Sequence, residues 1–316
     1  MRIGSFGEWQ LAQPSTPRSV LADVVRRAVG AEILRADRIL EGYSNEVYRV
    51  RAADDQDLMI RILRFDDDIS PSASAAEARA IALARAAGVP APEILLLDTI
   101  DAGDRGFPVM VQRTVPGRPL SQVIERLSEQ QVRQVLIRLG ELMARLNGIR
   151  VESELDWSTV MAAGLADRCA KRDQVLAGGF SATEFDQIIE LLAGYVRDFP
   201  VEEWVLCHGD LSGKHIFVTG DGGDSIAVTG MIDFGDWQAG APVHDLAVLR
   251  VREPQLEVSP LLLGFGAPAD ETYRRRLDLH TLLIALDSLT FGVDQHDPVG
   301  IARSGRQVRS LVSDLG

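Results

Sequence analysis

Two carboxylates stand at an ordered spacing in the carboxyl-terminal half of the chain. Asp210 ends a His-Gly-Asp run that follows a short apolar stretch, and Asp233 begins an Asp-Phe-Gly run that follows a later apolar stretch. Between them, a Gly- and Asp-rich segment at 220–224 predicts a turn that folds the chain back. Phosphoryl transfer needs such a pair, because one Asp can accept the proton of the attacking hydroxyl while another holds the magnesium ion on the nucleotide phosphates.

The spacing around these carboxylates is similar to that of a kinase catalytic loop. In kinases this loop reads His-Arg-Asp-x-x-x-x-Asn, and Asp-Phe-Gly follows further along the chain. Here four residues separate Asp210 from His215, which stands at the Asn position. The His-Gly-Asp form, together with the Asp-Leu-Ala run at Asp245, resembles the aminoglycoside and macrolide phosphotransferase family and the choline kinases. These are small-molecule kinases of the protein-kinase-like fold. The alternative is a buried His beside two unrelated acidic turns, which the ordered spacing disfavours.

The resemblance implies a role for each residue of these motifs. Asp210 is the expected catalytic base, and Asp233 is the expected Mg²⁺ ligand. At His215 a neutral imidazole nitrogen could replace the amide oxygen of the family's Asn, although magnesium prefers oxygen. Alternatively, His215 packs against the loop and Asp233 holds the metal without it. His208 and Asp245 are expected to orient the loop.

The amino-terminal part has residues at the places where a kinase binds nucleotide phosphates. The segment 42–45 resembles the phosphate-covering loop of small-molecule kinases, which makes Ser44 and Asn45 candidate phosphate contacts. Arg61 stands where kinases have a phosphate-binding Lys, and its guanidinium keeps the positive charge. Glu77, in an Ala-rich segment, is the expected ion-pair partner of Arg61. The alternatives are an exposed strand Arg and a solvated helix Glu.

The connection between the two expected lobes supplies further candidates. A nucleotide base would bind to the hinge backbone near 112–116, which makes Gln112 and Thr114 candidate nucleotide contacts. The acceptor site is expected on the carboxyl-terminal helices. Its candidate amine-binding residues, for each of which a solvated helix face is the alternative, are Asp167, Asp173 and Asp287.

The elements that must position these residues change in type along the chain. Apolar spacing predicts a helix over 18–30, and Gly88 with Pro90 ends an Ala-rich helix over 74–87. Strands of one sheet are expected within 38–50 (a hairpin) and at 58–63, 94–97 and 108–112. Mainly helical stretches follow at 121–147, 157–198 and 258–316. The expected fold class is α+β, a protein-kinase-like fold of two lobes. Residues 1–113 would form a small, mostly antiparallel-sheet N-lobe that binds the nucleotide, and residues 114–316 a larger, mainly helical C-lobe with the catalytic loop and the acceptor site.

Composition narrows the class of protein. The chain has 316 residues, of which 46% are hydrophobic and 25% charged, as is ordinary for a soluble globular protein. The net charge of −13 disfavours a nucleic-acid partner, and no apolar run is long enough to span a membrane. The start of the chain lacks the pattern of a secretory signal. Two cysteines cannot build a disulfide framework, so a cytoplasmic location is expected.

Together these patterns predict a nucleotide-dependent O-phosphotransferase. The enzyme would use ATP or GTP with Mg²⁺ and phosphorylate a hydroxyl of a small molecule. The family resemblance favours an antibiotic acceptor, an aminoglycoside or a macrolide, and hence antibiotic resistance. The alternatives are a metabolic kinase for homoserine, choline or a sugar, because the fold does not select the acceptor, and a nucleotide-binding pseudokinase. The presence of both Asp210 and Asp233 argues against the pseudokinase.

Overall fold

A computed structural model of the protein describes residues 13, 15–40, 45–64, 71–101, 106–153, 155–220 and 225–316. The chain divides into two compact units, each of which is described by itself. Unit 1 comprises 1–117 with 229–235, and unit 2 comprises 118–228 with 236–316. The short segment 229–235, which carries Asp233, therefore packs with the amino-terminal unit rather than with its neighbours in sequence.

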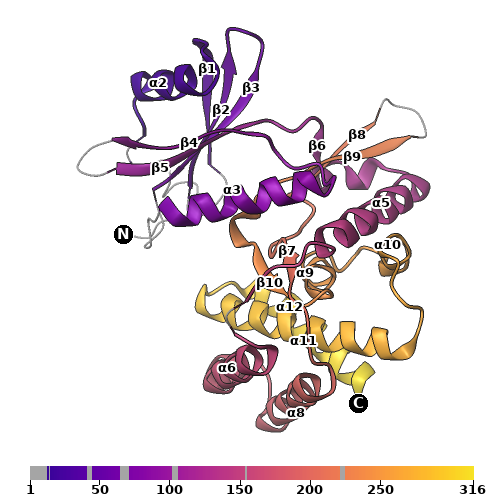
Figure 1. Ribbon diagram of the computed structural model, residues 1–316. Coiled ribbons are helices and arrows are strands. Elements are labelled where there is room, and N and C mark those ends of the chain that lie inside the picture. The colour runs from indigo at the N-terminus through magenta and orange to yellow at the C-terminus, as the bar shows by residue number, and fades with distance from the viewer. Residues whose placement is uncertain are drawn as a thin grey trace. The chain divides into compact units, whose positions relative to one another are not determined.

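Unit 1 contains an antiparallel sheet with the strand order β1-β2-β3-β5-β4 (Figure 1). Its strands are β1 (Ile33–Ile39), β2 (Asn45–Ala52), β3 (Asp57–Leu63), β4 (Ile94–Asp101) and β5 (Gly106–Arg113). Successive side chains of a strand point to opposite faces of a sheet. In β3, Leu58, Ile60 and Ile62 are fully buried in the core on one face, so Arg61 projects from the other face.

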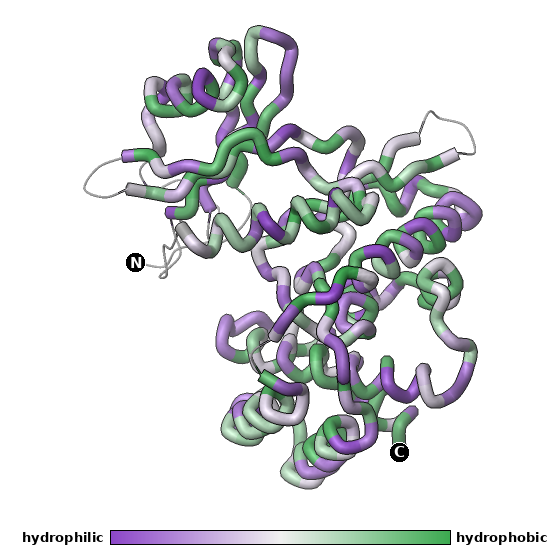
Figure 2. The backbone as a smooth tube through the Cα atoms, viewed as in Figure 1, coloured by the Kyte–Doolittle hydropathy of each residue, from purple (hydrophilic) through white to green (hydrophobic). Residues whose placement is uncertain are grey.

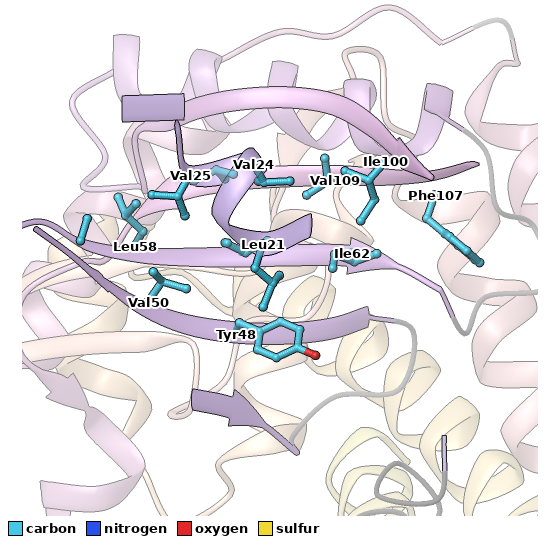
Figure 3. Close-up of a cluster of buried hydrophobic side chains, with 13 residues drawn as sticks. Leu21, Val24, Val25, Tyr48, Val50, Leu58, Ile62, Ile100, Phe107 and Val109 are labelled. Atoms are coloured by element: carbon cyan, nitrogen blue, oxygen red, sulfur yellow. The ribbon is translucent and has the colours of Figure 1, made fainter. Parts of the chain in front are cut away.

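The buried face of this sheet packs against α2 (Arg18–Val29). Leu21 and Val24 of the helix join Val50 and Ile62 of the sheet in one apolar cluster (Figure 3). Each fully buried side chain of this kind contributes about 1.5–3 kcal/mol. The cluster fixes the orientation of β3 and thereby the direction in which Arg61 leaves the sheet.

A second helix of unit 1, α3 (Pro71–Ala86), packs against β4 and β5. The sequence predicted it over 74–87. The chain leaves the helix through Gly88, whose φ of 78° is in the left-handed region that glycine adopts without strain. Glu77 is a buried residue of this helix.

Unit 2 is mainly helical, as expected. Its helices are α4 (Leu120–Val123), η1 (Ile124–Arg126), α5 (Glu129–Asn147), α6 (Trp157–Ala170), α7 (Arg172–Ala177), α8 (Ala182–Asp198), α9 (His244–Arg252), α10 (Val258–Phe265), α11 (Glu271–Asp294) and α12 (Pro298–Leu315). The expected helical stretch at 121–147 is divided, because Ser128 begins a new helix. Its hydroxyl accepts the N–H of Gln131 at 3.2 Å, and the Gln131 side chain accepts the N–H of Ser128 at 2.9 Å. This reciprocal capping box fixes the start of α5.

Helices α5 and α10 pack unusually closely. A Cβ added to Gly140 would lie 2.1 Å from the carbonyl oxygen of Leu261, and one added to Gly264 would lie 1.9 Å from that of Ile137.

Hydrophobic and hydrophilic residues alternate along α5, as expected of an amphipathic helix (Figure 2). No helix in the described part of the chain is long and apolar enough to cross a membrane.

Five short strands complete the structure. They are β6 (Arg118–Pro119), β7 (Val205–Cys207), β8 (Ile216–Gly220), β9 (Ile226–Met231) and β10 (Gln238–Gly240). Strand β7 pairs with β10, and β6, β8 and β9 form a second small sheet. The loop that carries Asp210 connects β7 to β8, as the sequence predicted.

Candidate active site

The loop around Asp210 is held in a conformation that requires glycine. Gly209 has a φ of 87°, and a Cβ at this position would lie 1.8 Å from the carbonyl oxygen of Asp236. The preceding strand is anchored by Cys207, which is buried and pairs with Gln238 in β10. The Gly of the His-Gly-Asp run therefore lets the backbone turn tightly against 236 before it presents Asp210.

Asp245 holds this loop from the first turn of α9. Its side chain is fully buried and accepts the backbone N–H groups of His208 at 2.9 Å and Gly209 at 3.0 Å. A charged acceptor makes such bonds stronger than neutral ones. The loop-orienting role expected of Asp245 is confirmed by these contacts.

Basic groups surround the carboxylate of Asp210, whose side chain is 18% exposed. Arg252 Nη2 lies 2.8 Å from Oδ1, while Lys214 Nζ lies 3.9 Å and His215 Nδ1 3.8 Å from Oδ2. The arrangement leaves a partly accessible carboxylate on a rigid loop. Such a group can accept a proton from a hydroxyl that reaches it.

His215 is buried at the end of the same loop and stacks on His208, with the ring centroids 5.9 Å apart. Its Nδ1 lies 2.6 Å from the backbone carbonyl of Asp210. A carbonyl only accepts, so Nδ1 carries the proton of the neutral ring, and Nε2 is the nitrogen that could bind a metal. The predicted role of His215 as a metal ligand stays a prediction.

In unit 1, Arg61 bridges two carboxylates. One guanidinium nitrogen, Nη1, forms an ion pair with Glu77 of α3, and the other, Nη2, lies 3.1 Å from Asp233 Oδ1. The ion pair between Arg61 and Glu77 is present as predicted, whereas the contact with Asp233 was not foreseen. The exposed-strand alternative for Arg61 is wrong, because only 12% of its side chain is exposed.

Asp233 itself has an uncommon backbone conformation. Its φ is 67°, in the left-handed region that costs a non-glycine residue roughly 1–2 kcal/mol. Non-glycine residues in this region are often found at functional sites, where the surrounding structure holds them. The conformation and the Arg61 contact together fix the carboxylate of Asp233. Its predicted role as a metal ligand is chemically suitable, because magnesium prefers carboxylate oxygens.

The remaining nucleotide candidates lie at the ends of strands in unit 1. Gln112 is buried near the end of β5, and Thr114 follows β5 and donates its hydroxyl to the carbonyl of Asp57 at 3.0 Å. Asn45 begins β2, while Ser44 lies outside the described residues. For each of them nucleotide binding stays a prediction.

The start of β2 is fixed by a buried acid that sequence reasoning did not single out. Glu46 accepts the N–H of Thr16 at 2.8 Å, the hydroxyl of Tyr48 at 2.5 Å and Nε of Arg64 at 2.9 Å. Burial alone would raise its pKa, but the bonds from Tyr48 and Thr16 leave the pKa of Glu46 below its usual value. The strand that begins at Asn45 is therefore rigidly held at its first residues.

The acidic residues considered for acceptor amines are largely paired within unit 2. Asp287 of α11 lies 2.5 Å from Arg168, and Asp167 lies 2.7 Å from Lys171. Asp173 lies in the first turn of α7. Within the described residues, no three side chains of His, Cys, Asp or Glu are grouped as a metal site.

Two residues that contact the catalytic loop were not predicted from the sequence. Arg252 contacts Asp210, as described above, and its neighbour Glu253 accepts the backbone N–H of Gly213 at 2.6 Å. Both lie at the carboxyl-terminal end of α9, seven and eight residues after Asp245. The sequence offers one indication of this contact: a helix that begins near Asp245 places residues two turns later on the same side, toward the loop that carries Asp210.

A chain of hydrogen bonds links Tyr195 of α8 to Gln238 of β10 through His280 and His244. Tyr195 OH lies 2.7 Å from His280 Nδ1, His280 Nε2 lies 3.0 Å from His244 Nδ1, and His244 Nε2 lies 2.6 Å from Gln238 Nε2. The Gln238 amide nitrogen can only donate, so when both rings are neutral each hydrogen bond is donated in the same direction, from Gln238 through His244 and His280 to the hydroxyl of Tyr195. Burial lowers the pKa of His244 and holds that of His280 well below its usual value.

Comparison with known families agrees with this geometry. The model of the phosphotransferase enzyme family matches residues 35–279, which is more than half of the chain. The chain belongs to this phosphotransferase family. It is therefore a kinase-type phosphotransferase, as the motifs predicted. No curated protein matches it by sequence.

Solved structures confirm the protein-kinase-like fold. The GDP and kanamycin complex of APH(2")-IIia has 19% sequence identity and a TM-score of 0.68, with 93% of this chain and 98% of that chain covered. A complex of aminoglycoside phosphotransferase APH(4)-Ia with ADP and hygromycin B has 17% identity, a TM-score of 0.66, and 93% and 98% coverage. The macrolide 2'-phosphotransferase MphH from Brachybacterium faecium has 17% identity, a TM-score of 0.59, and 92% and 97% coverage.

Proposed function

We propose that this phosphotransferase transfers the γ-phosphoryl group of ATP or GTP to a hydroxyl of a small molecule. The observation that supports this most is the Arg61 guanidinium, held between Glu77 and Asp233. A cation fixed by a helix Glu beside a metal-binding Asp is what kinase-type phosphoryl transfer requires. Nucleotide complexes of structural neighbours, with GDP and with ADP, support the choice of donor.

Arg61 would bind phosphate oxygens of the nucleotide, and Glu77 would keep the guanidinium oriented. Asp233 would hold Mg²⁺, which when bound neutralises negative charge on the phosphates. Ser44, Asn45, Gln112 and Thr114 are the further nucleotide contacts that we propose. In this assignment residues 1–113 form the nucleotide-binding sheet and helix, and residues 114–316 provide Thr114, Asp233, the catalytic loop and the acceptor site.

Asp210 would act as the catalytic base. Its carboxylate accepts the proton of the acceptor hydroxyl as the new oxygen–phosphorus bond forms, and the nucleoside diphosphate leaves. Asp245 accepts the N–H groups of His208 and Gly209 and thereby fixes the loop that carries Asp210. The Asp210 carboxylate therefore does not need to be repositioned during the reaction. His215 either supplies a second metal ligand through Nε2 or supports the backbone of Asp210.

For the acceptor we propose an antibiotic, an aminoglycoside or a macrolide, with resistance as the biological result. Structural neighbours of this chain were solved with kanamycin and with hygromycin B, and another is a macrolide phosphotransferase. A cytoplasmic location would suit such an enzyme. A hydroxyl-bearing metabolite such as homoserine, choline or a sugar is the alternative acceptor.

A panel of acceptors tests the proposal. The protein is incubated with ATP or GTP and Mg²⁺ and with aminoglycosides, macrolides, homoserine, choline and sugars in turn, and products are analysed by mass spectrometry. We expect one acceptor class to gain the mass of a single phosphoryl group. Absence of transfer to every acceptor, together with absence of Mg²⁺-dependent nucleotide hydrolysis, would instead indicate a pseudokinase.

A further inference from the structure

The carboxyl-terminal end of α9 contacts the loop that carries Asp210, and nothing in the family motifs accounts for this contact. We propose that Arg252 is a positioning residue for the reaction: it holds Oδ1 of Asp210, so that Oδ2 faces the acceptor hydroxyl. This inference rests on the proposed role of Asp210 as the base. It adds a residue that the His-Gly-Asp and Asp-Phe-Gly motifs do not include.

The two oxygens of the Asp210 carboxylate have different surroundings. Oδ1 is buried and is not hydrogen-bonded to any residue that the structure describes, but Arg252 Nη2 lies 2.8 Å away as an ion pair. The basic groups nearest to Oδ2, Lys214 and His215, are 3.9 Å and 3.8 Å away, too far for a hydrogen bond. Arg252 therefore restrains one oxygen and leaves the other for a substrate.

The end of α9 is itself attached to the loop. Glu253 accepts the N–H of Gly213 at 2.6 Å, and the carbonyl of Gly213 accepts the N–H of Ser121 at 3.0 Å. Arg252 and Glu253 are consecutive, so the contact of the Glu253 side chain with the loop restrains the backbone from which the Arg252 side chain starts. On a free helix end, the same contact would cost additional backbone entropy.

Half-exposure of Arg252 limits how large its effect can be. Its side chain is 47% exposed, so water screens part of its attraction for Asp210. Without Arg252 the Asp210 carboxylate would stay in the site, but its side chain would sample other rotamers. Misplacement of a catalytic group by about 1 Å can cost about a hundredfold in rate, and we therefore expect a loss of about 10–100-fold in kcat.

The test compares three variants with the wild type in steady-state kinetics on the acceptor that the panel identifies. In Arg252→Ala we expect the loss in kcat given above, with the KM of the nucleotide within about twofold of wild type, because Arg61, Glu77 and Asp233 are untouched. Arg252→Lys should recover part of the loss. Arg197→Ala, which removes an exposed cation that pairs with Asp198 and not with Asp210, should change kcat by less than about twofold.

Chemical rescue separates positioning from structural support. Guanidinium ion at millimolar concentration should restore part of the turnover of Arg252→Ala and leave the wild type unchanged, since a small cation can occupy the vacated place beside Oδ1. Thermal unfolding of each variant checks that it is folded.

Three results would overturn the inference. Unchanged kcat in Arg252→Ala would show that Asp210 needs no such partner, and an increase confined to the acceptor KM would make Arg252 an acceptor contact instead. A folded Arg252→Ala variant that loses kcat without guanidinium rescue also contradicts it. Failure of the proposed function is distinguishable, because then the wild type transfers phosphate to none of the acceptors, and the inference fails with it.

Discussion

Replacement of Asp245 by Asn would remove one of the hydrogen bonds that attach α9 to the catalytic loop, with the smallest change in volume. The two carboxylate oxygens of Asp245 each accept one backbone N–H, from His208 and from Gly209. An amide has one carbonyl oxygen, so one N–H keeps its acceptor and the other faces an NH₂ group. Hydrogen bonds to charged groups are worth about 1.5–3 kcal/mol each. We therefore expect Asp245→Asn to lower the free energy of unfolding by about 2–3 kcal/mol, and Asp245→Ala by about 3–6 kcal/mol.

The expected loss of turnover in Asp245→Asn is about a hundredfold, because the loop would no longer hold Asp210 within a fraction of an ångström. Urea unfolding followed by Trp fluorescence measures the stability, and acceptor phosphorylation measures kcat. Asp278→Asn is the matched control: Asp278 is 19% exposed and pairs with Arg250 of α9 at 2.7 Å rather than with the loop that carries Asp210. Turnover of Asp245→Asn equal to that of wild type, or an equal loss of turnover in Asp278→Asn, would refute the reasoning.

Three further predictions concern other parts of the site. Glu77→Gln should raise the nucleotide KM about tenfold, because a neutral amide holds the Arg61 guanidinium in its orientation less firmly than a carboxylate does; steady-state kinetics at varied nucleotide concentration measure this, and an unchanged KM would exclude the ion pair from nucleotide binding. Burial lowers the pKa of His280 and His244, so the unfolded chain binds more protons below about pH 6.5 and the free energy of unfolding falls on acidification. For His280 alone the loss should reach about 2 kcal/mol at pH 5, and His280→Gln should remove it; a wild-type stability that does not change between pH 7 and pH 5 would contradict this. If His215 binds metal through Nε2, His215→Ala should need more Mg²⁺ for its half-maximal rate while His215→Asn stays active; an unchanged Mg²⁺ requirement in His215→Ala would leave His215 a packing residue.

Several of these features could be read from the sequence because they depend on short, ordered patterns. The spacing of Asp210 and Asp233, the sheet with α3 inserted, and the pairing of Arg61 with Glu77 all follow from the order of elements in a kinase-like fold. Asp245 could be assigned to the loop because the Asp-Leu-Ala run that it begins resembles that of the phosphotransferase family.

Other features depend on tertiary contacts that no local pattern encodes. Arg252 reaches Asp210 only because α9 is long enough and correctly rotated to bring its end back to the loop. The contact between Arg61 and Asp233 depends on the segment 229–235 packing with unit 1. The division of 121–147 could have been predicted, since Ser128 and Gln131 have the spacing of a capping box. It was missed because apolar residues recur at helical intervals on both sides of Ser128.

The role of Asp210 as the base that activates the acceptor hydroxyl is tested most directly by single-turnover transfer in Asp210→Asn. The amide keeps the size of the side chain but cannot accept the proton as a carboxylate does. We expect the rate of acceptor phosphorylation to fall by about 10²–10⁴-fold, with nucleotide affinity close to that of wild type. A near-normal transfer rate in Asp210→Asn would contradict the assignment and remove Asp210 from the mechanism.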